Sequence, residues 1–212
     1  MTAGSMLCLL GFVSVFWKQF RMPLIWLPLA AGACFAFEPV FRSLRLGQVN
    51  IILAVLVSVD CLALPRHRRG YLVGVAAGLK VTPGIFLLYL ALQRDWRAVA
   101  RGVTALAGSL AVSACIAPAD TWHYWTDSLY NTTNVGSLIY GDNQSLTGVL
   151  ARALRTEHPS SAIVLPASIA MLALGAMACH RELRRGEDAA GLICLAIGGL
   201  LASPIAWSHH WV

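Results

Sequence analysis

Charged residues are scarce in this chain of 212 residues: they make up 12% of the sequence, whereas 58% of its residues are hydrophobic. An ordinary soluble domain carries about 25% charged residues, so the side chains needed for a water-exposed surface are missing. The mean hydropathy of +0.67 agrees with this conclusion. The composition excludes a soluble globular domain and predicts an all-α membrane bundle, with residues 1–212 as a single transmembrane domain.

Metal-binding and disulfide patterns are also missing. The six cysteines lie in or at the end of apolar stretches, and none belongs to a C-x-x-C pair or to a spacing typical of a zinc site. We therefore predict no metal site, with a divalent cation left as an open alternative. A cleavable signal peptide is not evident either, because Met1–Trp17 has no basic n-region and further apolar segments follow at once.

The net charge of +6 does not indicate a nucleic-acid partner. The basic residues occur in short clusters between apolar runs, which is typical of cytoplasmic anchors of membrane helices. A nucleic-acid-binding surface would instead gather them along one face. We expect membrane lipids, and not nucleic acid, as partners.

About seven apolar segments approach the length of about 20 residues that is needed to cross the hydrocarbon core. These segments are Gly4–Trp17, Met22–Phe41, Leu46–Leu64, Tyr71–Gln93, Ala98–Pro118, Ser160–Cys179 and Ala189–Trp207.

Lysine and arginine mark the cytoplasmic side, because basic loops stay inside. Four clusters qualify: Lys18 with Arg21, Arg66–Arg69, Arg94–Arg97 and Arg181–Arg185. Residues 119–150 contain no lysine or arginine and are rich in aromatic residues, including Tyr130, so they are predicted to form an outside loop. Glu38–Asn50 falls outside by the same count. The pattern predicts a multi-pass protein of the plasma membrane.

The segment Tyr71–Gln93 lies between two clusters that are both predicted to be inside, although it is too short to cross twice. Its middle contains Lys80, Pro83 and two glycines; proline removes a backbone donor, and a central lysine is costly in lipid. We predict a broken, re-entrant hairpin that enters from the cytoplasm. The alternative is a single spanning helix, with Arg94–Arg97 as an exception to the charge rule.

A first group of polar residues is predicted on the outer side, where arginines run against the charge bias. A guanidinium group binds phosphate oxygens in a bidentate manner, and a lipid-linked phosphate would lie at this depth. Snorkelling to lipid headgroups is the alternative. The candidates for substrate binding in this group are Arg42, Arg45, Gln48 and Asn50, with Glu38 beside them.

A second group comes from the outside loop, where amides and aromatic rings suit a sugar, although membrane-interface anchoring explains the aromatic rings equally well. Its candidates are Tyr124, Tyr140, Asn143 and Gln144. A third group is the pair His209 and His210, which follows a helix-breaking Ser-Pro and suits a phosphate partner, a proton carrier or a metal ligand. Lys80, in the interrupted segment Tyr71–Gln93, is a further candidate for substrate binding. The buried carboxylate of Asp60 is expected to pair with Lys80 or with the Arg66–Arg69 cluster.

Five strings in this order resemble actinobacterial polyprenol-phosphate-mannose-dependent alpha-1,2-mannosyltransferases, which are membrane enzymes of the GT-C type in glycosyltransferase family eighty-seven. The resemblance runs from about Gly47 to the end of the chain. The strings are Gly47–Asn50, Gly78–Pro83, Arg94–Arg97, Asn143–Leu146 and Ser203–Trp211.

The resemblance implies transfer of mannose from a polyprenyl phosphate to a hydroxyl group of a glycolipid or lipoglycan on the outer side of the plasma membrane. It also implies a general base, commonly an aspartate in the first outside loop. The amino-terminal region that would carry this aspartate is not found in the chain, so we expect a piece of a longer protein that lacks its base. The catalytic residue is therefore unknown.

Three other functions stay open. The strings do not separate mannose from arabinose, so a polyprenyl-phosphate-arabinose-dependent arabinofuranosyltransferase is the nearest alternative. The broken helix around Lys80 would also suit a transporter of lipid-linked sugars, although a transporter should show an internal repeat and none is evident. The third alternative is an inactive fragment.

Overall fold

The computed structural model describes residues 3–129 and 136–210, which form helices joined by short connections, without a named β-strand in this part of the chain. The all-α prediction is therefore confirmed. Tyr130 and Trp211, which were named above, lie outside the described residues.

The α-helices are α1 (Ala3–Gln19), α2 (Leu27–Ala36), α3 (Glu38–Arg45), α4 (Asn50–Ser58), α5 (Tyr71–Leu79), α6 (Phe86–Leu92), α7 (Trp96–Ile116), α8 (Pro118–His123), α9 (Leu146–Leu154), α10 (Ser161–Arg184) and α11 (Asp188–Ala202). Short 3-10 or π-helical turns are η1 (Leu24–Trp26), η2 (Val59–Ala63), η3 (Arg66–Arg68), η4 (Thr82–Ile85), η5 (Tyr124–Ser128) and η7 (Ser208–His210).

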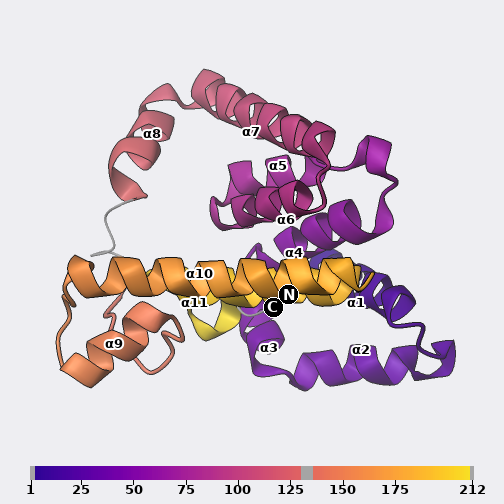
Figure 1. The fold of residues 1–212 in the computed structure, drawn as a ribbon, viewed down its shortest axis with the longest axis horizontal. Coiled ribbons are helices and arrows are strands. Elements are labelled where there is room, and N and C mark those ends of the chain that lie inside the picture. The colour runs from indigo at the N-terminus through magenta and orange to yellow at the C-terminus, as the bar shows by residue number, and fades with distance from the viewer. Residues whose placement is uncertain (1–2, 130–135, 211–212) are drawn as a thin grey trace.

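Glycines allow two helix pairs to pack closely. A Cβ atom added to Gly74 of α5 would lie 2.2 Å from the carbonyl oxygen of Gly102 on α7, and one added to Gly175 of α10 would lie 2.8 Å from the Cα of Gly198 on α11. Small residues at such contacts let two backbones approach, as is common between membrane helices. In Figure 1, α10 crosses the middle of the molecule with α11 behind it, while α7 and α2 lie on opposite sides of this pair.

Two apolar cores hold the helices together. The larger one gathers buried residues of α4, α5, α6 and α11, and Tyr89, Leu90 and Leu195 at its centre are fully buried. The smaller one joins α1, α3 and α4 around Leu9 and Ile51. Both cores contact α4, which therefore links the amino-terminal helices to the rest of the bundle.

The segment Tyr71–Gln93 is a broken hairpin, as predicted. Helix α5 ends at Leu79, Lys80 has an extended backbone (φ −154°, ψ 128°), and α6 returns after η4. The guanidinium of Arg69 donates a hydrogen bond of 3.2 Å to the side-chain oxygen of Gln93, so the two ends of the segment meet. The alternative of one straight helix is therefore wrong, while entry from the cytoplasm stays a prediction.

Two helices, α7 and α10, are long and apolar enough to span a membrane by length and composition. The segment Leu24–Arg45 adds a third only if its two parts, which are bent by 68°, count as one span. About seven spanning segments are thus not confirmed within the described residues. Helix α11 has 15 residues, or about 22 Å at ~1.5 Å per residue, and it ends before Ser203-Pro204, where proline disfavours a helical conformation in the preceding residue.

The predicted cytoplasmic clusters gather at one end of the bundle. A shallow pocket there is lined by Arg66, Arg94 and Arg184, which belong to three of the four clusters. The fourth cluster, at the end of α1, lies near the same end, because Gln19 donates a hydrogen bond of 3.0 Å to the carbonyl oxygen of Leu62. The four basic clusters therefore lie at the end of the bundle away from the start of α4 and the end of α11.

The expected pairing of Asp60 needs correction. Asp60 is fully buried, yet it accepts hydrogen bonds from the backbone N–H groups of Gly70 (2.5 Å) and Val73 (2.9 Å), and it forms no ion pair within the described residues. Its partners are the otherwise unsatisfied donors at the start of α5, so the predicted pairing with basic side chains is wrong. Within residues 119–150, the described part includes most of α8, all of η5 and the start of α9, while the placement of this stretch outside stays a prediction.

Candidate functional site

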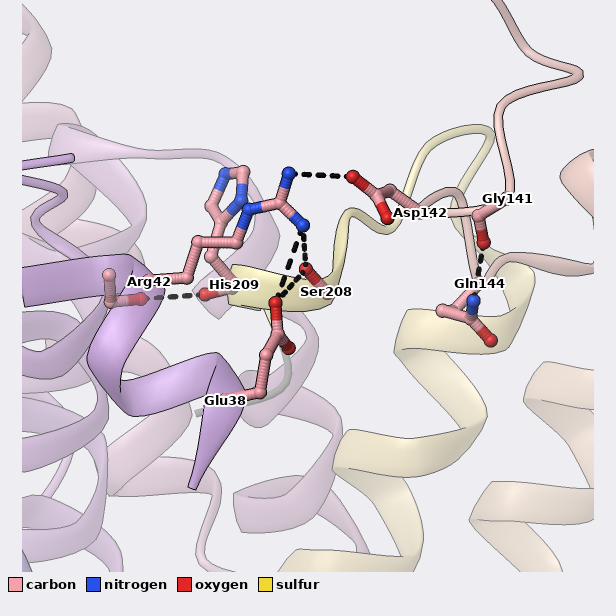
Figure 2. A network of polar contacts seen from close by, with 8 residues as sticks. Glu38, Arg42, Gly141, Asp142, Gln144, Ser208 and His209 are labelled. Atoms are coloured by element: carbon pink, nitrogen blue, oxygen red, sulfur yellow. Dashed lines mark hydrogen bonds and ion pairs between the residues drawn. The ribbon is translucent and has the colours of Figure 1, made fainter. Parts of the chain in front are cut away.

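Arg42 is the centre of a polar network at the end of the bundle away from the basic clusters (Figure 2). Its Nη1 donates to Oε1 of Glu38 (3.3 Å) and to the hydroxyl of Ser208 (2.9 Å), and its Nη2 donates to Oδ2 of Asp142 (2.6 Å). Helix α3 places Glu38 and Arg42 one turn apart on the same face. The guanidinium thus connects α3, the segment before α9 and the turn η7.

The charge of Arg42 is already compensated by two carboxylates. Its hydrogen bond lowers the pKa of Asp142, so that this carboxylate stays ionised at neutral pH. The side chains of Arg42 and Asp142 are 38% and 52% exposed, and ion pairs with this exposure contribute little to stability. The geometry therefore favours a clamp between segments over an open receptor for a phosphate group.

A second chain of hydrogen bonds runs from η7 to the tip of the hairpin. The carbonyl oxygen of His209 accepts from the hydroxyl of Ser43 and from Nδ2 of Asn50, both at 2.8 Å. The Oδ1 of Asn50 accepts from Nζ of Lys80 at 2.9 Å. Asn50 is buried and begins α4, so the structure brings three predicted substrate-binding residues together.

The two histidine rings pack edge to face with centroids 4.7 Å apart. Burial, followed by the charge of Lys80, lowers the pKa of His209 and lowers that of His210 to about 3. Both rings are therefore neutral at pH 7. The Nδ1 of His209 is buried without a hydrogen-bond partner among the described residues, so the histidines supply polar ring nitrogens here, whereas Lys80 supplies the positive charge.

Beside Lys80 and His210 opens a cavity of about 670 Å³. Its walls are mostly apolar and come from α1, α4, α10, α11 and the hairpin, with Phe16 and Phe86 among them. Polar side chains occur chiefly where α4 begins and α11 ends. The cavity is therefore amphipathic, with mostly apolar walls and a cationic end where Lys80 lies beside the start of α4.

Asn143 has a structural position. It is fully buried, and its Oδ1 accepts from the backbone N–H of Ala206 (3.1 Å) and from the N–H and hydroxyl of Ser145 (3.3 and 2.9 Å). Its Nδ2 donates to the carbonyl oxygen of Leu138. These contacts attach the turn before α9 to the chain that follows α11, and they leave no face of Asn143 open to a ligand.

The other predicted site residues are not brought into the network. Arg45 and Gln48 make no side-chain hydrogen bond within the described residues, and Arg45 is exposed. Tyr140 is 62% exposed, and Tyr124 is 40% exposed with its ring against that of Trp125. Gln144 is exposed and donates to the carbonyl oxygen of Gly141 (2.6 Å; Figure 2).

Sequence reasoning marked the regions of Asp142 and Ser208, since Asp142 directly precedes the string Asn143–Leu146 and Ser208 lies within the string Ser203–Trp211. It did not predict that both residues meet at Arg42. No such signal marked Ser43, because a serine among apolar helix neighbours has no pattern of its own. Within the described residues, no three His, Cys, Asp or Glu side chains come close enough to hold a metal ion.

The fold and the site define the class of protein: an all-helical membrane protein in which polar residues from distant segments meet beside an apolar cavity. The chain belongs to glycosyltransferase family 87, whose family model matches residues 1–204. No solved structure matches the chain.

Relatives in mycobacteria agree with this assignment. A protein of Mycobacterium tuberculosis (strain ATCC 25618 / H37Rv), named polyprenol-phosphate-mannose-dependent alpha-(1-2)-phosphatidylinositol mannoside mannosyltransferase, is 36% identical over 197 residues, which cover 91% of this chain and 46% of the relative. A protein of the same name from Mycolicibacterium smegmatis (strain ATCC 700084 / mc(2)155) is 40% identical over 201 residues, covering 88% of this chain and 45% of the relative. The chain thus spans about half the length of the curated relatives that it matches.

Proposed function

We propose that this protein is a membrane mannosyltransferase that transfers mannose from a polyprenyl-phosphate donor to a hydroxyl group of a glycolipid or lipoglycan. The names of the relatives favour a phosphatidylinositol mannoside as the acceptor. Membership of glycosyltransferase family 87 supports the reaction class.

The observation that carries the proposal is the convergence of four of the five strings at one end of the fold. Asn50 and Lys80 are hydrogen-bonded to each other, and Asn50 also binds the backbone of His209. Asn143 is attached to Ala206 and pairs with Trp207. The fifth string, Arg94–Arg97, lies at the basic end, where Arg94 lines the shallow pocket. A transferase needs its polar groups assembled in this manner around a donor and an acceptor.

We further propose that the convergent end faces the outside of the plasma membrane in a multi-pass, GT-C-like bundle. The support is the charge asymmetry, since all four basic clusters lie toward the other end. Single-cysteine labelling in a cysteine-free background tests this orientation. Positions 18, 68, 97 and 184 should react only from the cytoplasm, and the exposed positions 127 and 144 only from outside. Labelling of position 97 from outside alone would contradict this orientation.

The activity is tested in membranes from cells that express the full-length gene product. We expect label from polyprenyl-phosphate mannose, and not from polyprenyl-phosphate arabinose, to reach a phosphatidylinositol mannoside. Membranes without the protein are the control. Transfer of arabinose alone would establish the arabinofuranosyltransferase, and movement of intact lipid-linked sugar across vesicles without transfer would establish the transporter.

A further inference from the structure

The cavity beside the site has the form of a binding site for a lipid with one anionic head. Its volume of about 670 Å³ falls within the range of ~300–1,000 Å³ that is usual for small-ligand pockets. It is lined by apolar side chains along most of its length, including Leu53, Val57 and Leu192. A pocket of this size holds only the part of a long chain that is nearest the head.

The cationic end of the cavity carries an uncompensated positive charge. Lys80 is hydrogen-bonded to the neutral side chain of Asn50, and no carboxylate pairs with it among the described residues. A partly buried charge without a counter-ion is costly, and an anionic ligand would remove this cost. Arg42 differs in this respect, because Glu38 and Asp142 already occupy its terminal nitrogens.

His210 lines the cavity together with Lys80. Its ring is neutral at pH 7 because its pKa is lowered to about 3, and it is hydrogen-bonded to the backbone of Ile205. A neutral imidazole carries one N–H donor, and this contact uses it, so Lys80 is the charged donor that is left for an anion.

We propose that this cavity binds the isoprenoid chain of a polyprenyl-phosphate lipid next to its head, and that Lys80 at the hairpin tip binds the phosphate, with the neutral ring of His210 beside it. The inference rests on the proposed function only for the identity of the lipid. It moves the phosphate from Arg42 to Lys80 and gives the hairpin a role, because its break places the lysine in the wall of the cavity. Arg42 then acts as a positioning residue that holds η7, and with it His210, against α3.

Binding can be measured separately from transfer. Full-length protein in nanodiscs of phosphatidylcholine is titrated with a fluorescent polyprenyl phosphate that carries no sugar, and with the corresponding neutral polyprenol. Lys80→Met should weaken binding of the phosphate about tenfold to a hundredfold, the range that one hydrogen bond to a charged group is worth, and leave binding of the polyprenol unchanged. Lys80→Arg should retain most of the affinity.

A matched pair of tryptophan substitutions tests the apolar part of the cavity. Ala196 of α11 lines the cavity, whereas Ala170 of α10 is exposed. Ala196→Trp should weaken binding of both lipids, and Ala170→Trp should change neither. Size-exclusion profiles confirm that each variant is folded. A photoreactive isoprenoid bound to unmodified protein gives a reading that needs no variant: it should label α4, α11 or the hairpin around Phe86.

Several results would overturn the inference. Unchanged phosphate affinity in Lys80→Met, or a loss in Arg42→Met instead, would place the phosphate elsewhere. Equal competition by phosphatidylglycerol would show a site for any anionic lipid, and labelling confined to α7 or α9 would exclude the cavity. If the unmodified protein transfers sugar and Lys80→Met binds the polyprenyl phosphate as tightly as it does, only this inference is refuted. If Lys80→Met weakens binding as expected but the unmodified protein transfers no sugar, only the proposed function is refuted.

Discussion

Replacement of Asn143 by alanine should open the segment before α9 without unfolding the bundle. The Oδ1 of Asn143 is the acceptor for the buried N–H groups of Ser145 and Ala206. The hydroxyl of Ser145 keeps a second acceptor in the substituted protein, the carbonyl oxygen of Pro204 at 3.1 Å. Two backbone donors therefore lose their partner.

The size of the effect follows from these two donors. Each buried donor left without a partner costs about 1 to 1.5 kcal/mol at the lower end of the usual range, so local opening should become easier by roughly 2 to 3 kcal/mol. This corresponds to an increase of about 30- to 150-fold in the open population. Because the contacts are confined to residues 138–148 and 204–207, we expect a smaller change in the global unfolding temperature.

Thiol labelling at position 147 measures this opening. Thr147 is buried on the first turn of α9, and its hydroxyl has no hydrogen-bond partner among the described residues, so Thr147→Cys in a cysteine-free background is a mild reporter. The rate of labelling should rise by the factor given above with Asn143→Ala. Gln144→Ala, which removes one exposed contact, should change it less than about threefold. A rise below threefold with Asn143→Ala would refute the structural role and restore Asn143 as a candidate for contact with the sugar.

Three further predictions follow from packing and charge. Gly74→Leu should lower the stability of the detergent-solubilised protein by at least about 2 kcal/mol, because the added Cβ would clash with α7. Gly108→Leu should be nearly neutral, because a Cβ at this position has no atom within 4 Å. Equal melting temperatures of the two variants would contradict the close helix contact. Arg42→Gln should lower the stability of the protein by no more than about 1 kcal/mol, and Asp142→Asn should cause no further loss in that background. A double-mutant cycle of melting temperatures, at low and high salt, measures the coupling of the two residues. Additive losses would exclude the clamp. The pKa of His210 is about 3 in the folded protein and ordinarily 6.5, so its contribution to stability is complete above pH 6.5 and is lost as the pH falls toward 3. His210→Gln should therefore reduce the dependence of the melting temperature on pH between pH 7 and pH 4. An unchanged dependence would contradict a buried, neutral ring.

The break in the hairpin was predictable from the local sequence. Lys80 and Pro83 in an apolar run predicted the interruption, because both disfavour a continuous membrane helix in any context. The prediction of about seven spanning segments is not confirmed within the described residues, because apolar length alone does not reveal that a helix ends early. Helix α11 has only 15 residues, although the apolar segment predicted there runs to Trp207.

The polar residues divide in the same manner. Composition and residue type were sufficient to predict a membrane protein and to separate its basic clusters from its other polar residues. They also selected Asn50, Lys80 and His210 as candidates, because charge and hydrophobicity are properties of each residue alone. Only the tertiary structure decided what each side chain contacts. In the structure, Asn143 is hydrogen-bonded to the backbone of Ala206, Asp60 accepts a hydrogen bond from the backbone N–H of Gly70 before α5, and Arg42 pairs with Asp142. The physical reason is that a hydrogen bond or a counter-ion depends on which distant segments the packing brings within about 3 Å, and residue type does not contain that information.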